Sequence, residues 1–556
     1  MKPNLTYRNL FWRMLFLYFL FIAYQILHSD YLFTDEAFML WHQADHHTVF
    51  TLFHTEGRAL TGWLEQWLFE AGGTAANVKY IRLLSLGECV LTLIFLFLML
   101  RRWQQKGMEI SDALIYATVG FVAASLSTTI CIGWAVCTEI FIPTLLSLAA
   151  GWILYEAVGA STGEGLKEGA PVKIATLTSL CVIGLGVAAL FFYQSPYPFL
   201  LLPFYFLFLT RKDGKLSKPV IVGLVYYFVI LVVYFGLFSY WLKASGVVAA
   251  DRTELAFKPL DRLSFFFSFP LNQAFNGNAF FDARSILSQA VFPVLFLAWV
   301  VLTFYKSRRS QAVDKDQRPK TGGRIRYLLG MLAFWILGYL PLLIAQESFG
   351  PYRTMLVLSV MVFLMLADTV LLLIPSLRMA IVFVLIGVML VAGAYHYKVY
   401  LADPLTKEYQ AIRTAVREGY TDRTREVVFI RASDHGFEHS LGIGSFKDEF
   451  GMPSTNKDWT PEPLLKQLVY ELTGNRQQAA ALKVSQYATM EEWKAAGSQA
   501  SPKDAATREA GQPGSTDQKT AGQTNRLTPE SWADSTVLHR DSILYINAPK
   551  LLNDLK

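Results

Sequence analysis

Two adjacent carboxylates, Asp35 and Glu36, stand in the first polar segment of the chain, shortly after a long apolar run. Paired acids at such a position can supply a general base or a metal ligand. They can equally mark the start of a helix, with Thr34 or Asp35 as the N-cap and an acidic first turn. The sequence alone leaves both interpretations open.

Histidines gather in the same segment. Five of the nine His residues lie between His28 and His54, and His42 and His46 are four residues apart. That spacing lets two imidazoles share a metal on one helical face. A solvated polar helix face explains the pattern more simply, so we assign no metal site here, although a divalent metal stays open as a cofactor.

The motif HTEGRAL (residues 54–60) adds His54, Glu56 and Arg58. A guanidinium next to a flexible glycine suits a lipid-linked phosphate, because Arg binds phosphate oxygens through two parallel hydrogen bonds. Further along the chain, Glu139, Gln194 and the segment from Glu347 to Arg353 add polar groups at the ends of apolar runs. Each of these is also explained as a turn with interfacial aromatic residues.

The elements that carry these residues are membrane helices. Of 556 residues, 53% are hydrophobic and 17% are charged, and the mean hydropathy is +0.33. A soluble chain carries about a quarter charged residues, and apolar blocks of ~20 residues cross the hydrocarbon core as helices. A soluble enzyme, a disordered protein and a nucleic-acid binder are therefore excluded.

The apolar blocks predict a polytopic α-helical membrane protein with about eleven transmembrane helices within residues 1–396. The predicted spans are 10–28, 80–100, 112–130, 138–157, 174–193, 196–210, 220–241, 286–304, 327–345, 354–373 and 379–396. Alternate connections, starting with the N-terminal segment, carry more than twice as many Lys and Arg residues as the others. The positive-inside rule therefore places the N-terminus in the cytoplasm and the region after residue 397 outside. The net charge of +6 reflects this topology, not binding to nucleic acid.

The first external loop, 29–79, contains two amphipathic stretches, Glu36–His47 and Arg58–Ala71. In the second, apolar residues recur with helical spacing and include Trp63 and Trp67. Helices of this kind lie in the membrane interface with Trp at the level of the headgroups. The predicted topology thus gathers the carboxylates, amides and Arg residues on the external side, which is what a site for a membrane-embedded substrate needs.

Residues 397–556 form a different kind of region. Glu426–Ala432 and Ser542–Asn547 read as strands, and 460–474 reads as a helix behind Pro461. Residues 497–530 are rich in small and polar residues and predict a disordered insertion. We therefore expect a small external α/β region interrupted by a flexible stretch.

The arrangement resembles the GT-C class of integral-membrane glycosyltransferases. The resemblance rests on the acidic motif FTDEAF (33–38) in a first external loop, the interfacial helices, the many spans and the external C-terminal region. More narrowly, three segments are similar to those of Gtr-type glucosyltransferases that decorate O-antigen: HTEGRALTGWLEQWLF, FFYQSPYPFLLLPF and ESFGPYRTMLVL. The tail segment DEFGMPST (448–455) also resembles the family, without an assigned role.

The resemblance implies an enzyme of the bacterial cytoplasmic (inner) membrane. It would move a hexose such as glucose from a polyprenyl-phosphate donor to a surface glycan on the external face, with inversion. Asp35 is then the general base, with Glu36 orienting the acceptor or assisting a metal. The sequence and the resemblance together suggest two further groups: Arg58 and Arg353 for the donor phosphate, and His54, Glu56, Glu139, Gln194 and Glu347 for sugar or acceptor.

Two other functions stay open at this point. A flippase or transporter of a lipid-linked glycan is expected to carry charges deep within its spans and often inverted repeats. Only Glu88 is a candidate for a deep acid, and no repeat is visible. A polymerase or ligase of lipid-linked oligosaccharides would also work through external loops.

Overall fold

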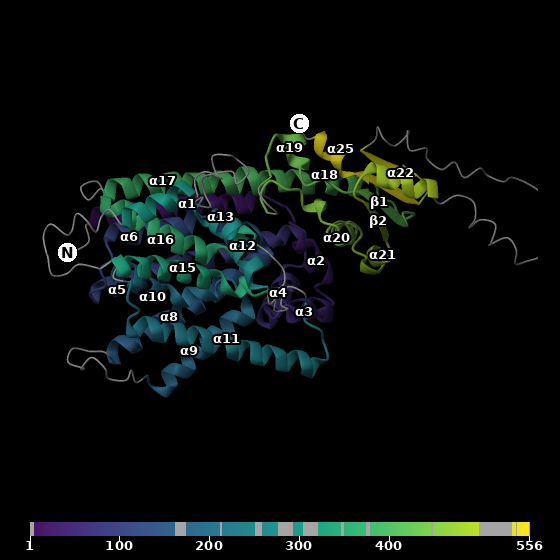
Figure 1. Cartoon of the computed structure of the whole chain (residues 1–556). Helices are drawn as coiled ribbons and strands as arrows, with labels where there is room; N and C mark the ends of the chain where they lie inside the picture. The colour runs from purple at the N-terminus through teal and green to yellow at the C-terminus, as the bar shows by residue number, and fades with distance from the viewer. Residues whose placement is uncertain are drawn as a thin grey trace, which may run out of the picture.

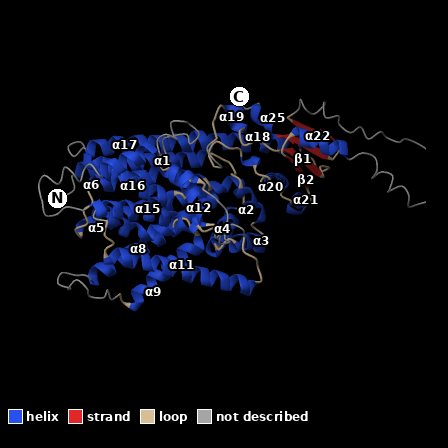
Figure 2. Cartoon of the chain, viewed as in Figure 1, coloured by secondary structure: helices blue, strands red, loops and turns tan. Residues whose placement is uncertain are grey.

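The computed structural model describes residues 5–161, 174–211, 214–250, 258–275, 293–303, 321–345, 350–373, 378–445, 449–499, 536–540 and 542–554. Within these residues the chain forms a bundle of long helices with a small sheet at one end of it (Figures 1 and 2). The long helices of the bundle are α1 (Leu5–His28), α5 (Val78–Gln105), α6 (Asp112–Ala124), α7 (Leu126–Gly133), α8 (Phe141–Ser161), α9 (Thr176–Phe192), α10 (Leu202–Arg211), α11 (Lys218–Ser245), α15 (Thr321–Leu343), α16 (Leu356–Leu373) and α17 (Arg378–Tyr395).

Shorter elements connect these helices. They are α2 (Asp35–His42), α3 (His46–Thr55), α4 (Ala59–Gly72), η1 (Ala75–Asn77), η2 (Ala135–Ile140), η3 (Tyr197–Leu201), α12 (Pro259–Ser268), α13 (Pro270–Phe275) and η5 (Tyr352–Thr354).

Six helices among the described residues are long and apolar enough to cross a membrane: Thr6–His28, Ala75–Gln105, Ala135–Gly159, Lys218–Ser245, Gly322–Leu343 and Arg378–Gly419. The pair α6 and α7 makes a seventh if it is taken as one span. Four further apolar helices are shorter: Thr176–Phe192, Tyr197–Arg211, Pro293–Thr303 and Leu356–Leu371. Each predicted span thus corresponds to an apolar helix, and the chain is a polytopic helical membrane protein.

The helix predicted over 112–130 is broken. Ser125 adopts an extended backbone between α6 and α7, and its Oγ accepts a hydrogen bond from the N–H of Thr128 at 3.2 Å. The two halves are bent by 42°. Residues from Ser125 to Ile140 are buried, and irregular backbone at membrane depth is tolerated only where protein or a cavity surrounds it. The break therefore brings backbone groups of η2 to the end of the bundle.

The first loop folds into three helices instead of the two predicted stretches. The stretch Glu36–His47 is interrupted because Asp45 caps α3, with its Oδ1 accepting from the N–H of Thr48 at 3.3 Å. Helix α4 follows the second prediction closely. It buries Glu65 and Phe69 and leaves Trp63 and Trp67 64% and 65% exposed. An exposed pair of indoles on one face is what an interfacial helix presents to a membrane.

The C-terminal region begins where α17 continues through the π-helix η7 (His396–Ala402) into α18 (Asp403–Gly419). Its other elements are β1 (Glu426–Ile430), α19 (Gly436–Leu441), η8 (Ser454–Asn456), α20 (Pro461–Thr473), α21 (Arg476–Ala480), β2 (Lys483–Tyr487), α22 (Met490–Gln499), β3 (Val537–Arg540), β4 (Ile543–Asn547) and α25 (Ala548–Asn553). Elements β1, α20 and β4 coincide with the three predicted ones. The predicted insertion at 497–530 falls almost entirely outside the described residues.

The sheet has the strand order β2-β1-β4-β3, with β1 parallel to both β2 and β4 and β3 antiparallel to β4. Because side chains alternate along a strand, those of β1 point to opposite faces of the sheet. Val427 and Phe429 join the core that continues into the helix bundle, whereas Val428 and Ile430 pack with Trp493 of α22. One face of the sheet is thus part of the same apolar core as the helices.

Several contacts fix this region to the first loop. Helix α20 packs on α2, and Glu471 accepts a hydrogen bond from the backbone N–H of Ala75 at 2.8 Å. The Arg476 guanidinium lies over the ring of Trp41 and donates to its carbonyl oxygen. The first loop and the C-terminal region therefore form one surface at this end of the bundle.

Candidate functional site

Asp35 opens α2 after a strained residue. Thr34 has φ = 41°, a backbone conformation that β-branched residues rarely adopt. Its backbone N–H donates to Ser454 Oγ at 2.7 Å. Strain of this kind persists only where surrounding contacts enforce it, and such residues cluster at functional sites. The contact with Ser454 therefore helps to set the direction in which the next residue points.

The Asp35 side chain is partly exposed, and its Oδ1 accepts a hydrogen bond from the indole N–H of Trp459 at 2.7 Å. Asp35 is the only partly exposed acid among four candidates; the other three, Glu36, Glu56 and Glu139, are buried. A general base must reach the proton that it accepts. Among these four acids, access favours Asp35.

Glu36 has a different environment. Its carboxylate pairs with Arg82 at 2.5 Å and accepts from the backbone N–H groups of Phe33 at 2.7 Å and Ala135 at 2.6 Å. Its side chain is fully buried. Burial raises the pKa of Glu36, and the Arg82 charge and these two N–H groups oppose the rise. Glu36 thus joins α2, α5 and η2, and it offers no exposed oxygen to an acceptor.

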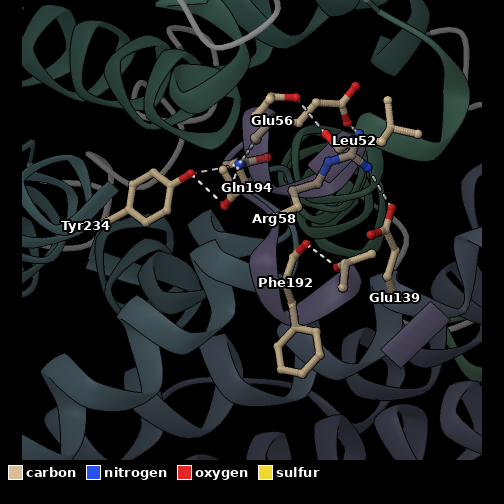
Figure 3. Close-up of polar contacts among 10 residues, drawn as sticks. Leu52, Glu56, Arg58, Glu139, Phe192, Gln194 and Tyr234 are labelled. Atoms are coloured by element: carbon tan, nitrogen blue, oxygen red, sulfur yellow. Dashed lines mark hydrogen bonds and ion pairs between the residues drawn. The ribbon is translucent and has the colours of Figure 1, made fainter. Parts of the chain in front are cut away.

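Arg58 lies at the N-terminus of α4 between two carboxylates. It pairs with Glu139 at 2.9 Å and also with Glu56 (Figure 3). Its guanidinium lies 5.0 Å from the ring centre of Tyr193 and 5.3 Å from that of Phe53. Two of the predicted sugar ligands, Glu56 and Glu139, are therefore partners of the predicted phosphate ligand.

Arg353 of η5 is held by the C-terminal region. It pairs with Glu449 at 2.5 Å, its backbone N–H donates to the same carboxylate at 3.3 Å, and its guanidinium lies 4.5 Å from the ring centre of Trp134. Burial lowers the pKa of Arg353, but the charges of Glu449 and of more distant groups, among them Asp35, raise it above its ordinary value. Arg353 is thus tied both to the C-terminal region and to Trp134, the residue before η2.

Tyr193, at the end of α9, lies beside Arg58, with its ring centre 5.0 Å from the guanidinium. The segment 134–139 contacts both arginines: Glu139 pairs with Arg58, and the guanidinium of Arg353 lies over the ring of Trp134. The same segment donates a backbone N–H to Glu36, the neighbour of Asp35. The predicted base and both predicted phosphate ligands therefore stand on elements that meet at residues 134–139.

Gln194 connects the turn before Arg58 to helix α11. Its amide N–H donates to the hydroxyl of Tyr234 at 2.8 Å and to the carbonyl of Glu56 at 3.1 Å, and Tyr234 donates to the carbonyl of Gly57 at 3.0 Å (Figure 3). Gly57 has φ = 71°, and a Cβ at this position would collide with the Tyr234 hydroxyl. Glycine is therefore required for the turn that presents Arg58.

A cavity of about 60 Å³ opens beside this network. Its lining is mostly apolar, with two polar side chains, Gln194 and Tyr234. The apolar lining comes from α9, α11 and the end of α15: Leu190, Leu231, Phe235, Phe238, Pro341, Leu342, Ile344 and Ala345. Its volume is well below the roughly 300 Å³ at which ligand pockets begin, so it has room only for a small part of a larger molecule.

The remaining predicted residues are placed as follows. His54 packs against Trp241, with ring centres 4.3 Å apart, and its buried Nε2 has no hydrogen-bond partner. Burial lowers the pKa of His54, which favours the neutral imidazole. Glu347 lies outside the described residues. Within the part of the chain that the structure describes, no group of three or more His, Cys, Asp or Glu residues could hold a metal ion.

Sequence reasoning missed three residues of this site, Arg82, Glu449 and Trp459, and the contact of Thr34 with Ser454. The tail motif DEFGMPST carried the one available signal, since it contains Glu449 and Ser454. Nothing local in the sequence shows that this motif meets Arg353 and Thr34, because the pairing spans 96 residues in one case and 420 in the other.

Comparison of the chain with protein-family models, with curated proteins and with solved structures found no match.

Proposed function

We propose that the protein is a membrane glycosyltransferase of GT-C type that transfers a hexose from a polyprenyl-phosphate donor to a surface glycan. The observation that supports this most directly is that the elements carrying Asp35, Arg58 and Arg353 meet at residues 134–139, with a small apolar cavity beside the nearby Gln194. A lipid-linked sugar phosphate has a matching division into apolar chain, anionic phosphate and polar sugar.

In the proposed reaction, a hydroxyl oxygen of the acceptor attacks the anomeric carbon of the donor sugar. The new C–O bond forms as the bond from that carbon to the phosphate oxygen breaks, and the hydroxyl proton passes to Asp35. The products are the extended glycan and polyprenyl phosphate, with the anomeric configuration inverted. Trp459 holds the Asp35 carboxylate by one oxygen, Oδ1, and the second oxygen is the one assigned to the proton.

The two arginines would stabilise the leaving phosphate. Arg58 and Arg353 are both held by carboxylates, and a guanidinium has five N–H donors, so a phosphate would bind beside or in place of these carboxylates. The phosphate gains negative charge as the bond to the sugar breaks. Contacts that strengthen in this way favour the transition state over the bound donor.

The proposal includes eleven crossings, a cytoplasmic N-terminus and an external C-terminal region. Segments assigned to the outside contact one another: the loop 29–79 contacts η2, residues 193–194 and the C-terminal region. Segments assigned to the cytoplasm also pair, as in Arg101 with Asp112 and Lys106 with Glu156. Eleven crossings, an odd number, would put the N-terminus and the C-terminal region on opposite sides of the membrane.

The test is sugar release from a hexose-labelled polyprenyl phosphate by the purified full-length protein, with a surface glycan as acceptor. We expect Asp35→Asn to lower turnover roughly 10²–10⁴-fold with unchanged yield in the membrane. Asp30→Asn is the matched control, because Asp30 is a carboxylate of the same loop, 40% exposed and paired with Lys79.

Full activity of Asp35→Asn would remove Asp35 as the base. Movement of intact lipid-linked sugar across vesicles, without formation of polyprenyl phosphate, would instead identify a transporter. Transfer of whole oligosaccharides but not of single hexoses would identify a polymerase or ligase.

A further inference from the structure

Trp459 contacts the candidate base Asp35 through its indole N–H, and its ring is exposed to solvent. It lies between η8 and α20, its side chain is 47% exposed, and its indole N–H donates to Asp35 at 2.7 Å. Trp63 and Trp67 are also exposed, but they lie on α4, where an interfacial position explains them. Trp459 instead belongs to the C-terminal region and lies outside any apolar helix.

The loop that carries Trp459 is attached to the ends of two parallel strands. Arg431, which follows β1, donates to the carbonyl of Asn456 at 3.2 Å, and Gln486 of β2 donates to the carbonyl of Asp458 at 2.5 Å. Ligands of open α/β sheets bind outside the carboxyl ends of the strands. The indole therefore stands at the edge of the sheet where such folds bind ligands.

Polar groups lie in the same loop as Trp459 and in the segment that follows β1. The amide of Asn456 donates to the exposed carboxylate of Asp434 at 3.0 Å, and Asp458 is exposed. The buried hydroxyl of Thr460 has no hydrogen-bond partner, and the same holds for Oδ1 of Asn456. An aromatic ring with amides and carboxylates beside it is a surface that matches the two faces of a sugar ring.

We propose that Trp459 and the carboxyl ends of β1 and β2 form the subsite for the acceptor glycan, with a pyranose ring stacked on the indole. The C–H groups of a pyranose carry partial positive charge and pack on the negative face of an aromatic ring. Its hydroxyl groups would meet Asp434, Asn456 and Asp458. This inference rests on the proposed function for the reaction, but the binding itself is independent of catalysis.

The hydrogen bond from Trp459 to Asp35 places the proposed acceptor subsite next to the candidate base. A glycan held on the indole has its next hydroxyl beside the carboxylate that would accept its proton. Trp459 would then determine which acceptor is used, whereas the donor is bound on the side of Arg58 and Arg353. Removal of the ring should therefore affect the acceptor and leave the donor site intact.

The experiment is ligand-detected saturation-transfer NMR on the full-length protein in nanodiscs, with neutral trisaccharides of glucose, galactose and rhamnose as probes. We expect at least one probe to bind the natural protein. Trp459→Ala should weaken its binding about tenfold, whereas Trp459→Phe, which keeps a ring but not the N–H, should retain most of it. Trp67→Ala is the matched control for loss of an exposed indole.

Binding by none of the trisaccharides, or equal binding by Trp459→Ala and the natural protein, would overturn the proposal. Equal losses in Trp459→Phe and Trp459→Ala would also overturn it, because they would assign the residue to holding Asp35. In a transfer assay, Trp459→Ala should raise the acceptor KM and leave the donor KM unchanged. Asp35→Asn should keep trisaccharide binding, so a failure of the proposed reaction is separable from a failure of this subsite.

Discussion

The adjacent acids Asp35 and Glu36 occupy opposite environments because successive residues of a helix point about 100° apart. Asp35 faces the surface that the C-terminal region covers in part, whereas Glu36 points into the bundle toward Arg82. One short motif therefore serves two purposes: its first acid is available to a ligand and its second holds three elements together. Neutralising Asp35 should therefore affect activity, whereas neutralising Glu36 should affect stability.

Glu36→Gln removes the charge opposite Arg82 and leaves a buried guanidinium without its ion-pair partner. Breaking a buried pair in this way costs about 3–5 kcal/mol. We expect a much reduced yield of folded, monodisperse protein and a lower Tm in detergent, measured by size-exclusion chromatography and thermal unfolding. Asp35→Asn should unfold like the natural protein. A natural Tm for Glu36→Gln would contradict this assignment.

Glu65 predicts a pH dependence of stability. Its carboxyl is fully buried in α4 and neither oxygen has a hydrogen-bond partner. Burial, together with the nearby acid Glu139, raises the pKa of Glu65 well above its ordinary value. The folded state therefore keeps the proton at pH values where the unfolded state releases it, so the free energy of unfolding falls as pH rises above about 4.5.

Glu65→Gln should abolish this contribution. At pH 5 we expect the variant and the natural protein to unfold at similar temperatures, and at pH 8 we expect the variant to be more stable by about 2–4 °C. Thermal unfolding between pH 5 and 9 measures the difference. Glu70→Gln, an exposed acid on the same helix, is the control and should follow the natural protein. Parallel pH profiles for Glu65→Gln and the natural protein would refute the role of burial.

At the scale of elements, the segment from Glu449 to Thr455 joins parts of the chain that are far apart in sequence. Glu449 pairs with Arg353, the N–H of Gly451 donates to the carbonyl of Tyr400 at 2.7 Å, and Ser454 contacts Thr34. Glu408 of α18 in turn accepts from the N–H groups of Ser454 and Thr455. The segment thus positions both the candidate base and one candidate phosphate ligand.

Gly451 is the most vulnerable point of this segment. It has φ = 70°, and a Cβ there would lie 2.5 Å from the carbonyl oxygen of Gly444. Gly451→Ala should lower the Tm and make the C-terminal region more sensitive to limited proteolysis. Gly442→Ala is a matched control, because Gly442 has φ = 67° but a Cβ there meets nothing within 4 Å. We expect the control to cost only the backbone strain, about 1–2 kcal/mol, and equal effects of the two would contradict the steric argument.

The elements also show what the sequence could and could not predict. Long apolar runs identify membrane helices because their period and length are local properties. The break at Ser125 was missed because its cause is a single side chain within an apolar run. Strand β2 was missed because three of the five residues of Lys483–Tyr487 are polar without a strict alternation, and the strand lies at an edge of the sheet. Glu449 contacts Arg353 and Trp459 contacts Asp35 only in the folded chain. No local sequence pattern predicts these contacts.

For the molecule as a whole, the grouping of contacts by membrane side predicts an orientation. The site, the loop 29–79 and the C-terminal region lie at one end of the bundle, and the basic connections pair among themselves. Alkaline phosphatase, which is active only outside the cytoplasm, reports the side. We expect activity for a fusion after Tyr420 and none for a fusion after Gly107, with green fluorescent protein giving the inverse pattern. The opposite result would place the proposed site in the cytoplasm.

The hydrogen bond from Thr34 to Ser454 joins positions 420 residues apart. During synthesis, at roughly 5–20 residues per second, the ribosome needs roughly 20–80 s to reach the second partner after the first has been made. Throughout that interval the nascent chain has its first acidic motif in place without Ser454, Glu449 or Trp459 to hold it. The candidate site would therefore be completed only after the last membrane helix has been made.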